Sequence, residues 1–259
     1  MSVSEPSSSL LDAGTVQSQV VDGVATIRFG HPKSNSLPGA LLARLAETIA
    51  WVGKDPGTRV VVLRSEGTGP FCAGASFDEF KALKTPEEGK KFFSGFAKVI
   101  LALIRCPCFV VTRVHGKTAG GGIGLVAASD YALATPEAAI KLSELAVGIG
   151  PFVVGPVIEK KIGLAAFSAL TVDADWRNAE WAHGVGLYSE LLDTPPALDY
   201  RVDEFAKKLA GYNPEAVRNV KEIFWAGTEG WPELLTARAE ISGTLVLGEH
   251  TKRAIGGGR

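Results

Sequence analysis

The first thirty residues contain two short apolar runs separated by a turn signal. Residues 16–21 and 24–29 are rich in β-branched residues, and Asp22-Gly23 between them is typical of a two-residue hairpin turn. Beyond a turn-rich stretch, apolar residues recur at helical spacing over 37–52. The pattern predicts a β-hairpin followed by a helix that ends near Gly53.

Strand and helix patterns then alternate along the chain. Apolar runs at 60–63, 108–112 and 131–134 have the length of buried strands. Between the first two runs, apolar residues repeat at helical spacing from Phe92 to Leu103. Strands that alternate with helices predict a parallel sheet with crossover helices.

The last third of the chain has a helical pattern from Gly163 onward. Asn213 followed by Pro214 is typical of a helix start, with Asn as the cap and Pro in the first turn. Candidate helices cover 164–170, 178–183, 202–210, 214–225 and 232–247. We therefore predict a flexible N-terminal tail at 1–12, an α/β core at 13–195 and a helical C-terminal portion at 196–259.

The charge balance argues against polyanionic partners. With 27 Lys plus Arg against 28 Asp plus Glu, the formal net charge is −1, which favours neither nucleic acid nor a charged membrane surface. The longest uncharged run, 145–158, is shorter than a bilayer span. Cys106 and Cys108 are poorly placed for an unstrained disulfide, and Cys72 makes the number of cysteines odd. These features predict a cytoplasmic protein with no nucleic-acid or membrane partner.

Glycine is over-represented, with 30 in 259 residues, about 12% compared with a usual ~7%. The densest cluster, 117–124, follows a strand, so its amides are expected to point out of a helix N-terminus toward an anion. A P-loop is excluded because that motif needs a glycine where the chain has Val111. A dinucleotide fingerprint is formally present at 122–127 with Glu144 as ribose acceptor, but too many residues separate it from the strand. The third hypothesis is an oxyanion hole, in which amides stabilise charge on a carbonyl oxygen.

A second glycine-rich loop, at 69–78, also lies between a buried strand and a helix. Two such loops on one parallel sheet can converge, and an oxyanion hole usually has two donors. Four segments together resemble the enoyl-CoA hydratase/isomerase (crotonase) superfamily, in order over 16–188. They are Phe71-Cys-Ala-Gly-Ala75, His115-Gly-Lys-Thr-Ala-Gly-Gly-Gly122, Ser143-Glu-Leu-Ala-Val-Gly-Ile-Gly-Pro151 and Asn178-Ala-Glu-Trp-Ala-His-Gly-Val-Gly-Leu-Tyr188.

The resemblance implies a fold and a set of site residues. The fold is a crotonase-like (ClpP/crotonase) α/β spiral of ββα units with a helical C-terminal portion. By similarity, the backbone amides of Ala75 and Gly121 form the oxyanion hole for a CoA thioester carbonyl, and the carbonyl of Ala73 meets the adenine. Gly74 and Gly120, which adjoin these positions, are expected to contact the substrate as well.

The chain departs from the family's hydratases at several positions. Those enzymes carry two glutamates: Glu144 matches the second, whereas Gly124 stands at the first. Phe152 replaces a glycine that follows a proline, and Ser76 replaces an aspartate. Hydration needs two groups, whereas a 1,3-proton shift needs one carboxylate. We therefore expect an enzyme that isomerises or hydrates an enoyl-CoA, with Glu144 as acid and base.

Three alternatives remain open. The first is an acyl-CoA decarboxylase, which needs no catalytic base. The second is an acyl-CoA-binding relative with little turnover, which needs no catalytic residues. The third is an NAD-binding oxidoreductase, which the poor match to the dinucleotide fingerprint disfavours.

Leu142, Leu145 and Val147 are apolar neighbours of Glu144 in the sequence. They are expected to desolvate its carboxylate and so raise its pKa.

Other contacts with the substrate follow from residue type. Phe77 and Phe152 are candidates for the acyl pocket, although core packing explains a single aromatic residue equally well. Lys33 is a candidate contact for the CoA phosphates, although a solvated charge is the commoner explanation. CoA is expected as part of the substrate and not as a permanently bound cofactor. The family's usual assemblies imply a homotrimer or homohexamer formed through 196–259.

No metal site is expected. His31, His183 and His250 have no Cys or carboxylate partners at ligand spacing.

Overall fold

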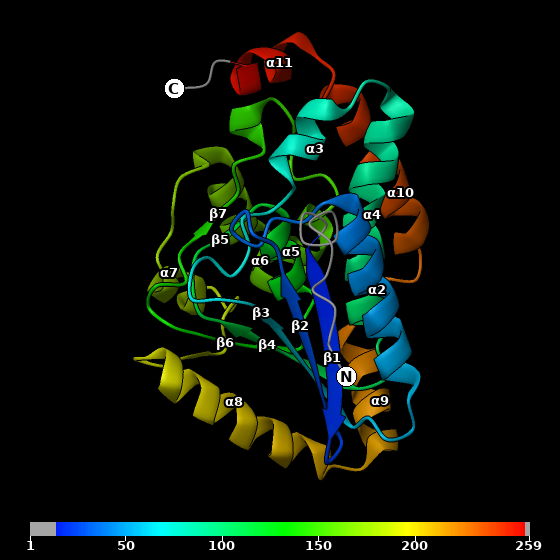
Figure 1. Ribbon diagram of the computed structural model, residues 1–259, viewed down its shortest axis with the longest axis vertical. Helices are drawn as coiled ribbons and strands as arrows, with labels where there is room; N and C mark the ends of the chain where they lie inside the picture. The colour runs from blue at the N-terminus through cyan, green and yellow to red at the C-terminus, as the bar shows by residue number, and fades with distance from the viewer. Residues whose placement is uncertain (1–13, 257–259) are drawn as a thin grey trace, which may run out of the picture.

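The predicted hairpin opens the fold. The computed structural model describes residues 14–256, so the tail expected at 1–12 lies outside the described residues (Figure 1). Strands β1 (Thr15–Val21) and β2 (Val24–Gly30) pair antiparallel. Asp22 and Gly23 between them both have positive φ, 50° and 82°. Two positive φ values characterise the type I′ turn, which explains the Asp-Gly sequence.

The predicted parallel sheet is confirmed. Its strand order is β1-β2-β3-β4-β6-β8, and every pair after the hairpin is parallel. The added strands are β3 (Val60–Ser65), β4 (Phe109–Val114), β6 (Tyr131–Ala134) and β8 (Glu190–Leu191). The last of these has only two residues, too few for a hydrophobic period to reveal.

A second ladder of very short strands lies beside the main sheet. It contains β5 (Thr118–Ala119) and β7 (Ile140–Lys141), which pair in parallel. Single bridges extend it, joining Leu37 to Ala75, Cys72 to Thr118 and Ile140 to Arg177. Successive strands of the main sheet are thus followed by a short extended segment in this ladder before the next helix. This repetition is the expected spiral of ββα units.

Three long helices stack on one face of the main sheet. Figure 1 shows α2 (Gly39–Lys54), α4 (Pro86–Ile104) and α10 (Trp231–Leu245) on this side, with α10 running along α4. A methyl group on Gly89 of α4 would lie only 2.6 Å from the Cα of Gly243 in α10. Glycines at this crossing therefore let the two helices touch.

Helix α8 (Pro195–Ala210) covers the opposite face of the sheet. Leu198, Val202 and Leu209 pack there on buried residues of β3, β4 and β6. Asp199 anchors the helix by accepting from Arg113 at 2.8 Å and lying 3.0 Å from Arg64. Helices on both faces explain why these strands are almost continuously apolar.

The remaining helices differ in part from the expected boundaries. Helix α6 (Gly155–Asp173) begins well before the predicted 164–170, and Gly163, with φ 79°, is a kink inside it. The predicted cap of α9 is confirmed, since Asn213 accepts from the amide of Glu215 at 2.9 Å. The other helical segments are α3 (Phe77–Ala82), α5 (Gly121–Ala127), η1 (Leu145–Val147), α7 (Ala179–Gly184), α9 (Pro214–Phe224) and α11 (Glu249–Gly256).

A buried ion pair joins α9 to the sheet. Lys221 lies 2.7 Å from Asp130, and both side chains are almost inaccessible, 3% and 4% exposed. Lys221 also donates to the carbonyls of Leu103 and Cys108 at 3.0 and 2.9 Å. Replacing Lys221 with Met should lower the free energy of unfolding by about 3–5 kcal/mol, because Asp130 would be left buried without its cation. Urea unfolding measures this loss, and the exposed Lys207→Met is the control; equal effects of the two substitutions would contradict the prediction.

The described residues contain no membrane-spanning helix, since none of these helices is both long and apolar enough. All three cysteines are buried free thiols.

Candidate functional site

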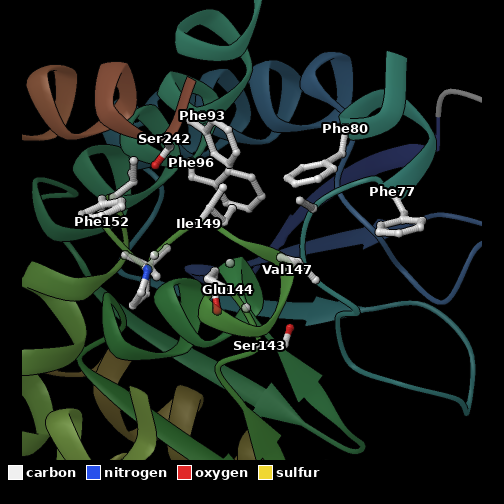
Figure 2. A pocket seen from close by; sticks show the side chains of 18 of the residues that line it. Phe77, Phe80, Phe93, Phe96, Ser143, Glu144, Val147, Ile149, Phe152 and Ser242 are labelled. Atoms are coloured by element: carbon white, nitrogen blue, oxygen red, sulfur yellow. The ribbon is translucent and has the colours of Figure 1, made fainter. Parts of the chain in front are cut away.

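A cavity of about 180 Å³ lies between the two glycine-rich loops and the helices α4 and α10 (Figure 2). Sites that enclose a whole small molecule are commonly larger, roughly 300–1,000 Å³. The volume of this cavity therefore suits one part of a larger ligand. The lining residues are Ala73, Gly74, Ala75, Phe77, Phe80, Phe93, Phe96, Gly120, Gly121, Ser143, Glu144, Val147, Ile149, Gly150, Pro151, Phe152, Val153, Val154 and Ser242.

The two loops meet at one wall of the cavity, as the sequence predicts. A methyl group on Gly74 would lie 3.5 Å from the Gly121 nitrogen and 2.9 Å from the Ala119 carbonyl oxygen. Gly74 also has φ of 86°, a conformation that favours glycine. This position therefore has to be glycine for the loops to come together.

Two backbone amides in these loops are free to bind a ligand. Leu37 accepts from Ser76 at 3.2 Å and donates to the Gly74 carbonyl at 2.8 Å, which fixes the loop on either side of Ala75. Gly121 is the first residue of α5, where amides have no partner within the helix. Within residues 14–256, no acceptor takes the hydrogen of either Ala75 or Gly121. Two converging free amides are the donor set of an oxyanion hole.

The carboxylate of Glu144 lies beside Gly120, the residue before one of these amides. A methyl group on Gly120 would lie 3.2 Å from Glu144 Oε1, which places that oxygen beside the loop that carries Gly121. The residue as a whole is half-buried, but Oε2 is hidden from solvent and has no hydrogen-bond partner among the described residues. Burial raises the pKa of Glu144 to about 7, opposed in part by its own amide and that of Ser143.

The source of this burial differs from the expectation at one residue, Leu145. Leu142 is buried and Val147 lines the cavity, but Leu145 is half exposed and does not shield the carboxylate. A one-turn helix, η1, follows Glu144 and turns Leu145 outward. The predicted rise in the pKa of Glu144 is confirmed. Of the three expected neighbours, Leu145 alone points away into solvent.

Gly124 lies outside the cavity and against the helix that follows it. A methyl group there would be 2.7 Å from Val154 Cγ1 and 3.6 Å from Ile100 Cδ1. Val154 therefore fills the space that a longer side chain at 124 would need. Among the residues that line the described cavity, Glu144 is the one with an ionisable side chain.

We expect Gly124→Ala to lower the free energy of unfolding by about 1–3 kcal/mol, because the added methyl overpacks the site. Shortening Val154 to Ala should relieve the contact, so the double variant should be more stable than the sum of the two single effects. Urea unfolding of the four proteins measures this coupling. A coupling indistinguishable from zero would mean that Val154 does not occupy the space at 124.

The two predicted aromatic residues both line the cavity. Phe77 is 49% exposed and stacks on Phe80 with ring centroids 6.1 Å apart. In Figure 2, Phe77 and Phe152 lie at opposite ends, so the cavity runs from the exposed Phe77 to the half-buried Phe152, near which Ser242 is 1% exposed. Sequence reasoning missed Phe93 and Phe96, because residues at helical spacing in α4 are typical of core packing.

The other predicted contacts lie nearer the exterior. Ala73 is exposed at the edge of the cavity, and its amide donates to the Ser34 carbonyl at 3.1 Å. Lys33 does not line the cavity; its ammonium pairs with Asp78 at the start of α3. A role for Ala73 or Lys33 toward CoA stays a prediction.

The described histidines and thiols lie outside this cavity. Burial next to Arg113 and Arg64 lowers the pKa of His115 to about 4. Within residues 14–256, no group of three or more His, Cys, Asp or Glu side chains is arranged to hold a metal ion.

Comparison with known proteins gives a consistent family. Residues 19–252 match the sequence model of a family described as enoyl-CoA hydratase/isomerase. The (7aS)-7a-methyl-1,5-dioxo-2,3,5,6,7,7a-hexahydro-1H-indene-carboxyl-CoA hydrolase of Rhodococcus jostii is 29% identical over 204 residues, 78% of this chain and 76% of that protein. The ethylmalonyl-CoA decarboxylase of Mus musculus is 26% identical over 245 residues, 90% of this chain and 74% of that protein.

A solved structure has the same fold. The enoyl-CoA hydratase structure from Mycobacterium smegmatis superposes with a TM-score of 0.77 at 30% identity, and covers 90% of this chain and 91% of that one.

Proposed function

Because the chain belongs to the enoyl-CoA hydratase/isomerase family, we propose that it acts on an acyl-CoA thioester by forming and stabilising its enolate. CoA enters as part of the substrate and leaves with the product. The observation that carries the proposal is the arrangement of two free amides, Ala75 and Gly121, beside the desolvated carboxylate of Glu144.

The first step is removal of a proton from the carbon next to the thioester carbonyl. The C–H bond breaks, the proton passes to Glu144, and the electron pair moves through the new C=C bond onto the carbonyl oxygen. The amides of Ala75 and Gly121 donate to that oxygen, and each such donor typically contributes about 3–4 kcal/mol to the transition state. A pKa of about 7 lets Glu144 both accept the proton and return it near neutral pH.

Isomerisation of an enoyl-CoA is the outcome that best fits a single carboxylate. When the acyl group carries a double bond between its third and fourth carbons, Glu144 can return the proton to the fourth carbon, and the double bond moves into conjugation. Hydration would need a second group to activate water. Position 124 holds glycine and is packed against Val154, so it offers no such group.

Decarboxylation is the second candidate, and two observations support it. A relative that is aligned over 90% of this chain is an ethylmalonyl-CoA decarboxylase. The lining residues also include no cation. A substrate carboxylate would therefore be poorly stabilised, whereas its loss as CO₂ would leave an enolate that Ala75 and Gly121 can bind.

Product analysis distinguishes these outcomes. The purified protein would be incubated in deuterated water with 2-enoyl-, 3-enoyl-, branched enoyl- and carboxyacyl-CoAs, and products followed by mass and NMR spectroscopy. We expect migration of the double bond with deuterium at the carbon that receives the proton. Addition of water would show that the protein is a hydratase and not an isomerase, and release of CO₂ would show that it is a decarboxylase. Binding without conversion of any substrate would overturn the enzymatic proposal and favour an acyl-CoA-binding protein.

We also infer a homo-oligomer, a trimer or a hexamer. Leu164 and Val172 in α6 and Ile223 in α9 are 65%, 79% and 73% exposed, so they are apolar side chains that a partner copy can cover. The three free thiols support a cytoplasmic protein. Sedimentation equilibrium measures the oligomeric state of the protein, and a monomer would contradict the inferred trimer or hexamer.

A further inference from the structure

Ser242 is a polar residue in the enclosed part of the cavity that the proposed reaction does not use. It lies in α10, lines the cavity and is 1% exposed. Its hydroxyl has no hydrogen-bond partner within the described residues. Buried hydroxyls are nearly always hydrogen-bonded, because a buried polar group without a partner is costly.

The fold holds Ser242 in this place. The neighbouring Gly243 touches Gly89 of α4, where a methyl on Gly243 would lie 2.4 Å from the Lys90 nitrogen. Lys90 in turn pairs with Glu240 of α10 at 2.8 Å, on the exposed side of the same contact. The contact brings Ser242 to the same cavity wall as Phe93 and Phe96, which lie one and two turns beyond Gly89 on α4.

Ser242 lies away from the exposed end of the cavity. Figure 2 shows it near Phe152, Phe93 and Phe96, whereas Phe77 lies at the other end. The thioester would be held by the loops of Ala75 and Gly121, so Ser242 would meet a part of the acyl group that is remote from the reacting carbon. The surrounding aromatic rings offer no competing hydrogen-bond partner.

The charge of the cavity restricts what Ser242 can recognise. Its lining includes no cation, and Glu144 supplies its one ionisable group among the described residues. A carboxylate at the enclosed end would lack a counter-charge. An uncharged oxygen, a carbonyl or a hydroxyl, loses less solvation on burial than a carboxylate, and its hydrogen bond with the serine hydroxyl compensates that loss.

We propose that Ser242 is a specificity residue that hydrogen-bonds an uncharged oxygen substituent on the acyl group, remote from the thioester. This rests on the proposed action on acyl-CoA thioesters. The residue selects the substrate class, acyl chains that carry a keto or hydroxyl oxygen, and takes no part in proton transfer. Such a site rejects the analogue that lacks the oxygen because its own hydroxyl is then left unpaired.

The test compares matched acyl-CoA pairs that differ only by one oxo or hydroxyl group replaced by methylene. The ratio of kcat/KM for the two members is measured for the natural chain, Ser242→Ala and the control Ser168→Ala. Ser168 is an exposed serine in α6 that lies outside the cavity. We expect the natural chain and the control to prefer the oxygenated member. Ser242→Ala should reduce the ratio about tenfold or more, mainly by loss of activity on that member.

A ratio that Ser242→Ala leaves unchanged at every oxygen position would overturn the proposal. Turnover of the unsubstituted member reports separately on the proposed function, because that substrate does not need Ser242. If no member is turned over, the same ratio is taken from dissociation constants measured by calorimetry, and an unchanged ratio there overturns the proposal as well. Melting temperatures confirm that each variant is folded.

Discussion

Glu144→Gln should lower the turnover of acyl-CoA substrates by roughly 10²–10⁴-fold, the usual contribution of a positioned acid or base. Gln keeps the size and hydrogen-bonding capacity of the side chain but does not accept a proton at neutral pH. Substrate affinity should change little, since the carboxylate acts in proton transfer and the loops hold the thioester. Steady-state kinetics and calorimetric binding measure the two effects separately.

The same substitution should stabilise the protein above neutral pH. The folded-state pKa of Glu144, about 7, is raised above the ordinary 4.5. The folded chain therefore binds the proton more tightly than the unfolded chain, and stability falls as the pH rises from about 4.5 to about 7. Gln removes this dependence, so the gain should approach about 3 kcal/mol above pH 7 and vanish below pH 4.5.

In the natural chain, kcat/KM should rise with pH and level off above about 7, as the carboxylate becomes the base.

Lys207→Met, a distant substitution, is the control for stability and rate. An unchanged rate in Glu144→Gln would contradict the role of Glu144 in proton transfer. If Glu144→Gln lost the expected activity but gained no stability above pH 7, the result would contradict the burial of the Glu144 carboxylate and leave its catalytic role standing.

Ala75→Pro should lower kcat by about 10²–10³-fold, the usual effect of removing one oxyanion donor. Proline has no amide hydrogen, and its ring would occupy the place of that hydrogen in the cavity. The loop should keep its conformation, because its two hydrogen bonds to Leu37 are made by the neighbours of Ala75. The Leu37 amide donates to the Gly74 carbonyl, and the Ser76 amide donates to the Leu37 carbonyl.

Ala75→Gly is the matched control, because it changes the side chain and retains the amide. It should keep most of the activity, and circular dichroism should show both variants folded. Equal losses in the proline and glycine variants would mean that the Ala75 amide does not stabilise the reacting oxygen.

The strands of the main sheet other than β8 were predictable because their signals are local. The Asp22-Gly23 turn and the apolar runs that became β3, β4 and β6 each fall within a few residues. The short strands of the second ladder were not predictable, since two residues carry no period. The early start of α6 escaped prediction because Gly155 and Pro156 precede a pattern that Gly163 interrupts, and these residues are typical of turns.

The candidate site was predictable where its chemistry lies in the backbone. Glycines that permit close approach brought Gly74 beside Gly121, and the family motif pointed to Glu144, whose carboxylate lies beside Gly120. The walls were not predictable. Ser242 enters the cavity because two helices far apart in the sequence cross at glycines, and neither helix carries a local signal of that crossing.

The most direct test of enolate formation is hydrogen exchange at the carbon next to the thioester. Short saturated acyl-CoAs, which cannot isomerise or lose CO₂, would be incubated with the natural chain and with Glu144→Gln in deuterated water and followed by NMR. The natural chain should incorporate deuterium at that carbon, and Glu144→Gln should slow the incorporation at least a hundredfold. Exchange at equal rates in both proteins would contradict proton removal by Glu144. So would a natural chain that binds the saturated acyl-CoAs without exchanging their protons and yet turns over unsaturated ones.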